Sequence, residues 1–163
     1  MESGLEERAR RVLEACRRAG VRLALAEASC GGLVSACLTD IPGASAVVER
    51  GFVPYSNGAK AELLGVPVPL MVAHGAVSEE VSRALAEGAL AHSPADLALG
   101  ETGIAGPSGG SEAKPVGLVH LAVARRGGSV VHERHVFTGD RAAIRRATAA
   151  RCLELLLSVV ERG

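Results

Sequence analysis

The segment Glu27-Ala28-Ser29-Cys30-Gly31-Gly32 combines a carboxylate, a hydroxyl, a thiol and two glycines where a short apolar run gives way to a helical pattern. The first amide N–H groups of a helix have no partner within it, so they can bind an anion or a developing oxyanion. We therefore expect Cys30, Gly31 and Gly32 to offer such donors to a ligand. A glycine turn with a purely structural role explains the same spacing nearly as well.

Tyr55 and Lys60 lie five residues apart around a predicted turn. Lys60 and Lys114 are the two lysines of the sequence, so chemistry that needs an amine able to lose its proton has two candidates. A partly buried lysine gives up its proton more easily and can then act as a general base toward a serine hydroxyl. An exposed, fully charged lysine is the more common state, and the spacing is compatible with both.

The segment from Gly100 to Gly110 contains five glycines and is predicted to be a long loop after a strand. Glycines allow positive φ angles and a close approach of the backbone to a ligand. The segment matches neither a P-loop nor the dinucleotide-binding fingerprint. It is suited to cradling a phosphate or a sugar, with a structural loop as the alternative.

The histidine and cysteine spacings predict no metal site and no disulfide framework. His132 and His135 are three apart on a predicted strand, which sends their rings to opposite faces of the sheet. No CxxC spacing occurs among the cysteines. We expect all four to be buried or free thiols, namely Cys16, Cys30, Cys37 and Cys152.

Length and charge limit the classes of protein to which the chain can belong. Its 163 residues predict one domain over 1–163, and 48% hydrophobic with 22% charged residues is an ordinary globular composition. Eighteen basic residues balance eighteen acidic ones, which disfavours nucleic acid and anionic membranes as partners. No apolar stretch is long enough to span a membrane, and the charged N-terminus does not resemble a signal peptide. We therefore expect a cytoplasmic protein.

Hydrophobic periodicity and turn residues predict an α/β fold that positions these segments. It is a three-layer α/β/α sandwich with a mixed, mostly parallel sheet and one antiparallel hairpin. Helices are predicted over 5–18, from the Gly31-Gly32 turn to 39, and over 60–64, 78–92 and 140–161. Strands are predicted over 21–26, 46–53, 95–100, 117–126 and 129–137, with a loop over 65–69.

Several short motifs, taken in order, resemble the CinA C-terminal domain family over nearly the whole chain. They are Ala26-Glu27 with Gly31-Gly32, Asp40-Ile41-Pro42-Gly43-Ala44-Ser45, Tyr55-Ser56-Asn57 with Lys60, Leu64-Gly65-Val66, His74-Gly75-Ala76-Val77-Ser78, Thr102-Gly103-Ile104-Ala105-Gly106-Pro107, Gly109-Gly110-Ser111, Lys114-Pro115-Val116-Gly117 and Gly139-Asp140-Arg141. The resemblance implies the stand-alone form of this competence/damage-inducible family. Characterised family enzymes are nicotinamide mononucleotide (NMN) deamidases, which release the carboxamide nitrogen as ammonia. They are understood to need no metal or cofactor and commonly self-associate, which implies a homo-oligomer.

The resemblance also implies roles for individual residues. Lys60 matches the general base and Tyr55 a neighbouring hydroxyl. The polar groups of the substrate pocket are matched by Ser45, Thr102 and Arg141. Donors for the substrate phosphate are expected from Arg141, from the turn at Gly31 and from the glycine-rich segment around Gly106.

The position of the serine nucleophile differs from the family pattern. Where the family has Ala-Glu-Ser-Cys-Thr-Gly-Gly, this chain has Ala26-Glu27-Ala28-Ser29-Cys30-Gly31-Gly32, so Ala28 occupies the serine position. Ser29, one residue on, or the thiol of Cys30 could replace it as nucleophile. The alternative hypothesis is a catalytically silent nucleotide-binding or regulatory homologue.

Overall fold

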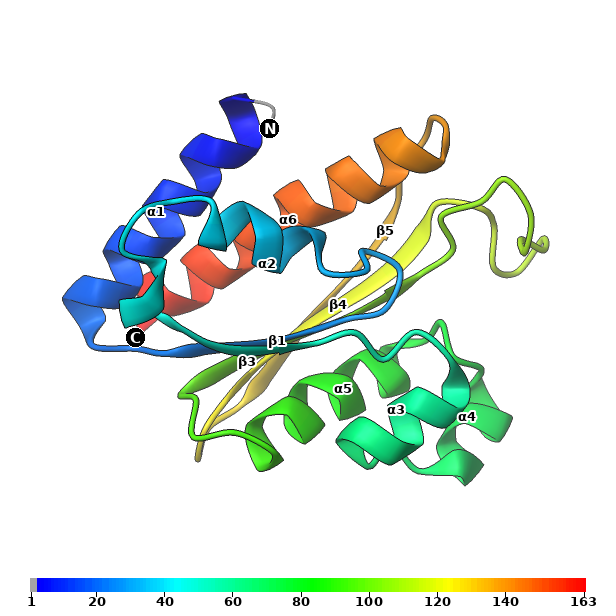
Figure 1. Ribbon diagram of the computed structural model, residues 1–163. Helices are drawn as coiled ribbons and strands as arrows, with labels where there is room; N and C mark the ends of the chain where they lie inside the picture. Colours follow the sequence, from blue (N-terminus) through cyan, green and yellow to red (C-terminus); the bar gives the residue numbers. More distant parts are fainter. Residues whose placement is uncertain (1–2) are drawn as a thin grey trace.

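Five strands form a single sheet in the order β2-β1-β3-β4-β5, with helices on both faces (Figure 1). The structure is a computed structural model that describes residues 3–163. The strands are β1 (Leu23–Glu27), β2 (Val48–Phe52), β3 (Leu97–Gly103), β4 (Leu118–Arg125) and β5 (Val130–Val136). The helices are α1 (Ser3–Ala19), α2 (Leu33–Thr39), α3 (Asn57–Leu64), α4 (Val68–His74), α5 (Glu79–Ala91) and α6 (Arg141–Arg162), with a short 3-10 turn at Ala44–Ala46.

The sheet contains both kinds of strand pairing. Strand β1 pairs in parallel with β2 and with β3, whereas β4 pairs antiparallel with β3 and with β5. The predicted three-layer α/β/α fold with a mixed sheet and an antiparallel hairpin is confirmed. Two of the four pairs are antiparallel because β4 is reversed, and the other four strands of the sheet run in the same direction.

Alternating leucine and alanine on the central strands assigns each face to its own layer of helices. Leu23 and Leu25 of β1 belong to the core cluster shared with α1, α2 and α6, whereas Ala24 and Ala26 belong to the cluster shared with α3, α4 and α5. Figure 1 shows the first set of helices above the sheet and the second set below it. Small side chains on the lower face let helix α5 approach the strands closely.

Two glycines make the close packing around α5 possible. A Cβ atom on Gly100 of β3 would lie 2.2 Å from the Ser82 carbonyl oxygen of α5. A Cβ atom on Gly88 of α5 would lie 2.2 Å from the Leu64 carbonyl oxygen of α3. Such distances are far below van der Waals contact, so both contacts require glycine. Helix α3, which carries Lys60, is held against α5 in this way.

The structure differs from the predicted elements at two places that matter for the site. Strand β3 continues through Gly103, so Glu101 and Thr102 lie on a strand and not in the predicted loop. Helix α4 begins at Val68, within the segment predicted as a loop over 65–69. Its Pro67 and Pro69 occupy the N-cap and the first turn, where a missing N–H costs no helical hydrogen bond.

Other local predictions are confirmed. Ser78 accepts a hydrogen bond from the Val81 N–H at the start of α5, and Asp140 accepts one from the Ala143 N–H at the start of α6. All four cysteines are free and buried. Within residues 3–163, no helix has the length and apolar character needed to cross a membrane.

Candidate active site

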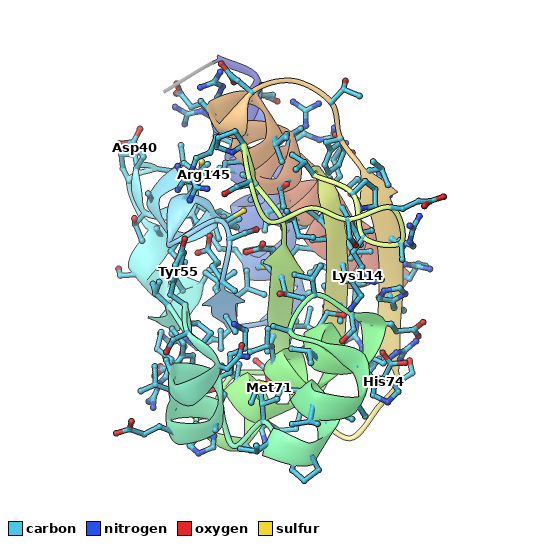
Figure 2. The ribbon with its side chains drawn as sticks, turned by 90° about the vertical axis from the view of Figure 1, so that its right-hand side faces the viewer. Asp40, Tyr55, Met71, His74, Lys114 and Arg145 are labelled. Atoms are coloured by element: carbon cyan, nitrogen blue, oxygen red, sulfur yellow. The ribbon has the colours of Figure 1, made fainter. Side chains whose placement is uncertain are left out.

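A cavity of about 260 Å³ opens at the carboxyl ends of the parallel strands β1 and β3. Ligands of α/β proteins commonly bind at the carboxyl ends of parallel strands. The cavity lining joins the β1–α2 turn, the N-terminal end of α3, the end of β3 and the start of α6. Figure 2 looks onto these strand ends, with Tyr55 between the helix layer that carries Arg145 and the helix layer that carries Met71. The lining residues are Ala28, Ser29, Tyr55, Ser56, Asn57, Lys60, Ala76, Val77, Thr102, Gly103, Ala105 and Arg141.

Lys60 reaches the cavity from helix α3, which is capped by the Ser56 hydroxyl accepting from the Ala59 N–H at 3.0 Å. The lysine side chain is almost entirely buried, with 3% of the residue exposed. Its Nζ donates to the Tyr55 carbonyl oxygen at 3.1 Å. Burial lowers the pKa of Lys60, and the nearby charge of Glu101 partly opposes this effect. Lys60 is thus a desolvated amine at the cavity wall.

Ser29 brings a hydroxyl into the same cavity. It follows Ala28 in the β1–α2 turn, and its Oγ donates to a carboxylate oxygen of Glu101 on β3. The second Glu101 oxygen accepts from the Cys30 N–H at 2.9 Å. Glu101 is fully buried, and this burial raises its pKa against the opposing effect of the two hydrogen bonds. The Ser29 hydroxyl therefore has a carboxylate as its acceptor.

A second buried carboxylate, Glu27, binds the amides at the start of helix α2. Its oxygens accept from the Val34 N–H at 2.7 Å and the Ser35 N–H at 3.0 Å, and the Ser35 hydroxyl also donates to it at 2.7 Å. Glu27 lies directly beside Glu101 in the register of β1 and β3. Together the two glutamates bind the main-chain amides of Cys30, Val34 and Ser35. Of the three amides expected to face a ligand, that of Cys30 is therefore already bound to a carboxylate.

The Cys30 thiol points away from the cavity toward helix α6. It is fully buried, and its Sγ lies 3.9 Å from the Arg145 carbonyl oxygen. Contact with the Cys152 thiol and burial together raise its pKa well above the ordinary value. Nucleophilic attack requires a thiolate, so this environment disfavours Cys30 as the attacking group. Ser29 lines the cavity, whereas Cys30 is not among the lining residues.

Two arginines of helix α6 organise the loops around the site. Arg141 lines the cavity and donates to the Gly106 carbonyl oxygen at 2.7 Å and to the Tyr55 hydroxyl at 3.3 Å. Arg145 donates to the carbonyl oxygens of Ser29 at 3.2 Å and Cys30 at 2.7 Å, which holds the β1–α2 turn against the helix.

The structure brings together five of the residues named from the sequence, Ser29, Tyr55, Lys60, Thr102 and Arg141, around one cavity. Thr102 directs its hydroxyl to the Ala76 carbonyl oxygen at 2.9 Å. Gly31 and Gly32 form the adjoining turn with φ angles of 59° and 100°. Ser45 does not join this group. It is exposed and lies just before β2, where its carbonyl oxygen accepts from Arg22. This is the amino end of β2, at the opposite end of the strands from the cavity.

The main residues that the sequence analysis missed are Glu101, Asn57 and Arg145. The sequence does contain one indication that Glu101 is functional, because it is the single carboxylate in the mostly apolar segment from Leu97 to Ile104. Arg145 gave none, because its partners lie 115 and 116 residues away.

Comparison with known proteins places this geometry in a family. The sequence matches the CinA C-terminal domain over residues 5–160. The chain belongs to the CinA C-terminal domain family. It is similar to the crystal structure of competence/damage inducible protein CihA from Agrobacterium tumefaciens, with 44% identity, a TM-score of 0.95 and coverage of 98% of this chain and 97% of that one. A CinA superfamily protein from Klebsiella pneumoniae is 31% identical, with a TM-score of 0.93 over 98% and 99% of the two chains.

The sequence relatives of this CinA-family chain have two lengths. A CinA-like protein of Anaeromyxobacter sp. (strain Fw109-5) is 54% identical over 137 residues, which make up 84% of this chain and 33% of that protein. The chain therefore spans about a third of such relatives. The nicotinamide-nucleotide amidohydrolase PncC of Escherichia coli (strain K12) is 46% identical over 155 residues, covering 95% of this chain and 94% of that enzyme.

Proposed function

We propose that this CinA-family chain hydrolyses the carboxamide of nicotinamide mononucleotide, with Ser29 as the nucleophile. The observation that carries the proposal is the shared cavity: a hydroxyl on Ser29 and a desolvated amine on Lys60 line the same pocket. The similarity to a nicotinamide-nucleotide amidohydrolase over nearly the full length of both chains supports the substrate class.

The proposed reaction is acyl transfer followed by hydrolysis. The Ser29 oxygen attacks the amide carbon, ammonia leaves, and water releases nicotinate mononucleotide from the resulting ester. Lys60 exchanges a proton within the pocket, and burial, which lowers its pKa, makes that proton easier to release. The reaction as proposed uses no metal and no cofactor, because side-chain groups supply the nucleophile and the proton transfers.

Substrate binding is assigned to the rim of the cavity. Arg141 carries a guanidinium suited to a phosphate, and Tyr55 offers a hydroxyl beside it. The Gly106 carbonyl orients the same guanidinium from the glycine-rich segment. We further propose that the protein acts in the cytoplasm as a homo-oligomer, without nucleic acid or membrane partners.

A second function, that of a silent nucleotide-binding or regulatory protein, is favoured by one observation. Ala28 has a methyl group where the family pattern has its serine, and a methyl group cannot attack a carbonyl. Under this hypothesis the pocket binds the nucleotide and releases no ammonia.

Ammonia release from nicotinamide mononucleotide by the purified protein separates the two functions. We expect turnover in the wild type and in Ser129→Ala, a matched change in the exposed hairpin turn, and none above background in Ser29→Ala. Calorimetry with substrate and product is run alongside. Binding heat without ammonia would support the regulatory function, and the absence of both in folded protein would reject both.

A further inference from the structure

We infer that Glu101 is the catalytic proton acceptor for the Ser29 hydroxyl, so that the site operates with a serine–glutamate pair. This inference rests on the proposed function, because it assigns a role within the same reaction. It differs from the serine–lysine pairing that the family resemblance implies for Lys60.

The geometry of Glu101 is that of a base held in place on both oxygens. One oxygen accepts the Ser29 hydroxyl, and the other accepts the Cys30 N–H at 2.9 Å. The carboxylate is fully buried beneath the turn, whereas Ser29 is partly exposed and lines the cavity. A ligand in the cavity can therefore meet the hydroxyl while the carboxylate stays shielded from water. The orientation fixed by these two hydrogen bonds directs the Ser29 hydroxyl proton to the Glu101 carboxylate.

Lys60 is less well placed for that step. Its described hydrogen bond runs from Nζ to the Tyr55 carbonyl oxygen, whereas the described partner of the Ser29 hydroxyl is Glu101. The negative charge of Glu101 also favours the ammonium form of Lys60, although burial opposes it. With the carboxylate charged and the amine protonated, the pocket contains an acceptor for the hydroxyl proton and a donor for the departing nitrogen.

The proton transfers balance with these two groups. As the Ser29 oxygen bonds to the amide carbon, its proton moves to Glu101 and the carbonyl oxygen takes the electron pair. The carbon–nitrogen bond then breaks, Lys60 protonates the nitrogen, and ammonia leaves an ester on Ser29. Water attacks the ester and gives a proton to the now neutral Lys60. The serine oxygen leaves with the proton held by Glu101, which returns both groups to their starting states.

The first test compares Glu101→Gln with Glu27→Gln, the neighbouring buried glutamate at the same register. Gln keeps the shape but cannot take a proton. We expect Glu101→Gln to lower kcat at least about 100-fold, the usual contribution of general acid–base catalysis, and to remove the acid limb of the pH–rate profile. Glu27→Gln should retain that limb even if its stability falls. A Glu101→Gln enzyme with wild-type kcat and pH profile would overturn the inference.

The second test needs no turnover. In Ser29→Cys the new thiol lines the cavity, while the four native cysteines are buried and should react slowly with iodoacetamide. A charged Glu101 disfavours the thiolate, so adding Glu101→Gln should speed alkylation at pH 7 by about tenfold, the effect of one pKa unit. Adding Glu27→Gln instead should change the rate less. Equal rates with and without Glu101 would mean that the carboxyl is neutral at rest, which overturns the inference.

The two tests separate this inference from the proposed function. Wild-type protein that releases no ammonia would reject the deamidase, and the alkylation rates would still show whether Glu101 is charged beside position 29. Active wild type with an equally active, stably folded Glu101→Gln variant would reject the role of Glu101 and leave the deamidase in place.

Discussion

The Lys60 amine donates to the main-chain carbonyl of Tyr55, five residues earlier, at 3.1 Å. This contact turns the end of a buried lysine side chain toward the cavity and away from the helix that carries it. Lys60→Met removes the amine and keeps the apolar stem. We expect kcat for ammonia release to fall at least about 100-fold, with no loss of thermal stability, because a buried amine is replaced by an apolar group.

Lys114→Met is the matched control for this change. Lys114 donates to the His74 carbonyl away from the cavity lining, in the region labelled in Figure 2. A similar loss of activity in both variants would argue against a specific role of Lys60.

Ala28→Ser tests which of two adjacent positions supplies the nucleophile. The new hydroxyl would line the cavity, but the Glu101 carboxylate is already bound by Ser29 and Cys30. We therefore expect Ala28→Ser to raise ammonia release only slightly, and Ser29→Ala to abolish it. If the double variant Ala28→Ser/Ser29→Ala is as active as the wild type, the serine at position 28 is sufficient and Ser29 is not required.

The pH–rate profile of kcat/KM should be bell-shaped. Burial raises the pKa of Glu101, so activity should appear only above the ordinary carboxyl range as the group loses its proton. Burial lowers the pKa of Lys60, so activity should decline below the ordinary lysine value as the ammonium loses its proton. A profile whose acid limb coincides with that of an ordinary exposed carboxyl would contradict this assignment.

Acid should weaken the fold through Glu133 on β5. Arg151 of α6 donates to both of its oxygens at 2.7 Å, and these hydrogen bonds lower the pKa of Glu133 from 4.5 to about 2. The stabilisation is complete above pH 4.5 and is lost as the pH falls through the folded-state value. At pH 7, Glu133→Gln should cost about 1 kcal/mol, because the pair is partly exposed.

Urea unfolding of wild type and Glu133→Gln at several pH values measures this difference. It should shrink between pH 4.5 and 2, while Glu112→Gln, on an exposed loop, should match the wild type throughout. A difference that does not change with pH would show that the ion pair is not its source.

Two helical glycines should respond in opposite ways to alanine. Gly88→Ala places a methyl group 2.2 Å from the Leu64 carbonyl oxygen, so we expect a loss of about 2 kcal/mol from overpacking. Gly58→Ala meets only the Ser56 hydroxyl, at 3.8 Å, and should gain up to about 1 kcal/mol of helix propensity. Equal unfolding midpoints for the two variants would contradict the packing described between α3 and α5.

Local pattern was sufficient to predict most elements, because the Leu/Ala alternation, the caps at Ser78 and Asp140 and the turn at Gly127 are all signals between near neighbours. Local pattern did not predict where β3 ends. Gly100 and Gly103 indicate a loop, but Glu101 between them pairs with Glu27 of β1 on one side and with Leu121 of β4 on the other, which extends the strand. Non-local pairing overrides local propensity here.

The site was predictable only in part for the same reason. Tyr55 and Lys60 are close in sequence and their association is local. Ser29 and Glu101 meet only after the parallel pairing of β1 and β3 has formed. The helix α4 was missed for a different reason, since Pro67 and Pro69 favour a loop by composition yet fit the first turn of a helix.

The contact between Ser29 and Glu101 joins positions 72 residues apart in the sequence. It limits which substitutions either position can accept without a change at the other. If Ser29 alone mutates to an apolar residue, a buried carboxylate loses a donor. If Glu101 alone does so, the hydroxyl and the Cys30 amide lose their acceptor, and an unpaired buried polar group costs about 1–3 kcal/mol. The two codons are therefore expected to change together, so relatives should separate into lineages that carry both residues and lineages that carry neither.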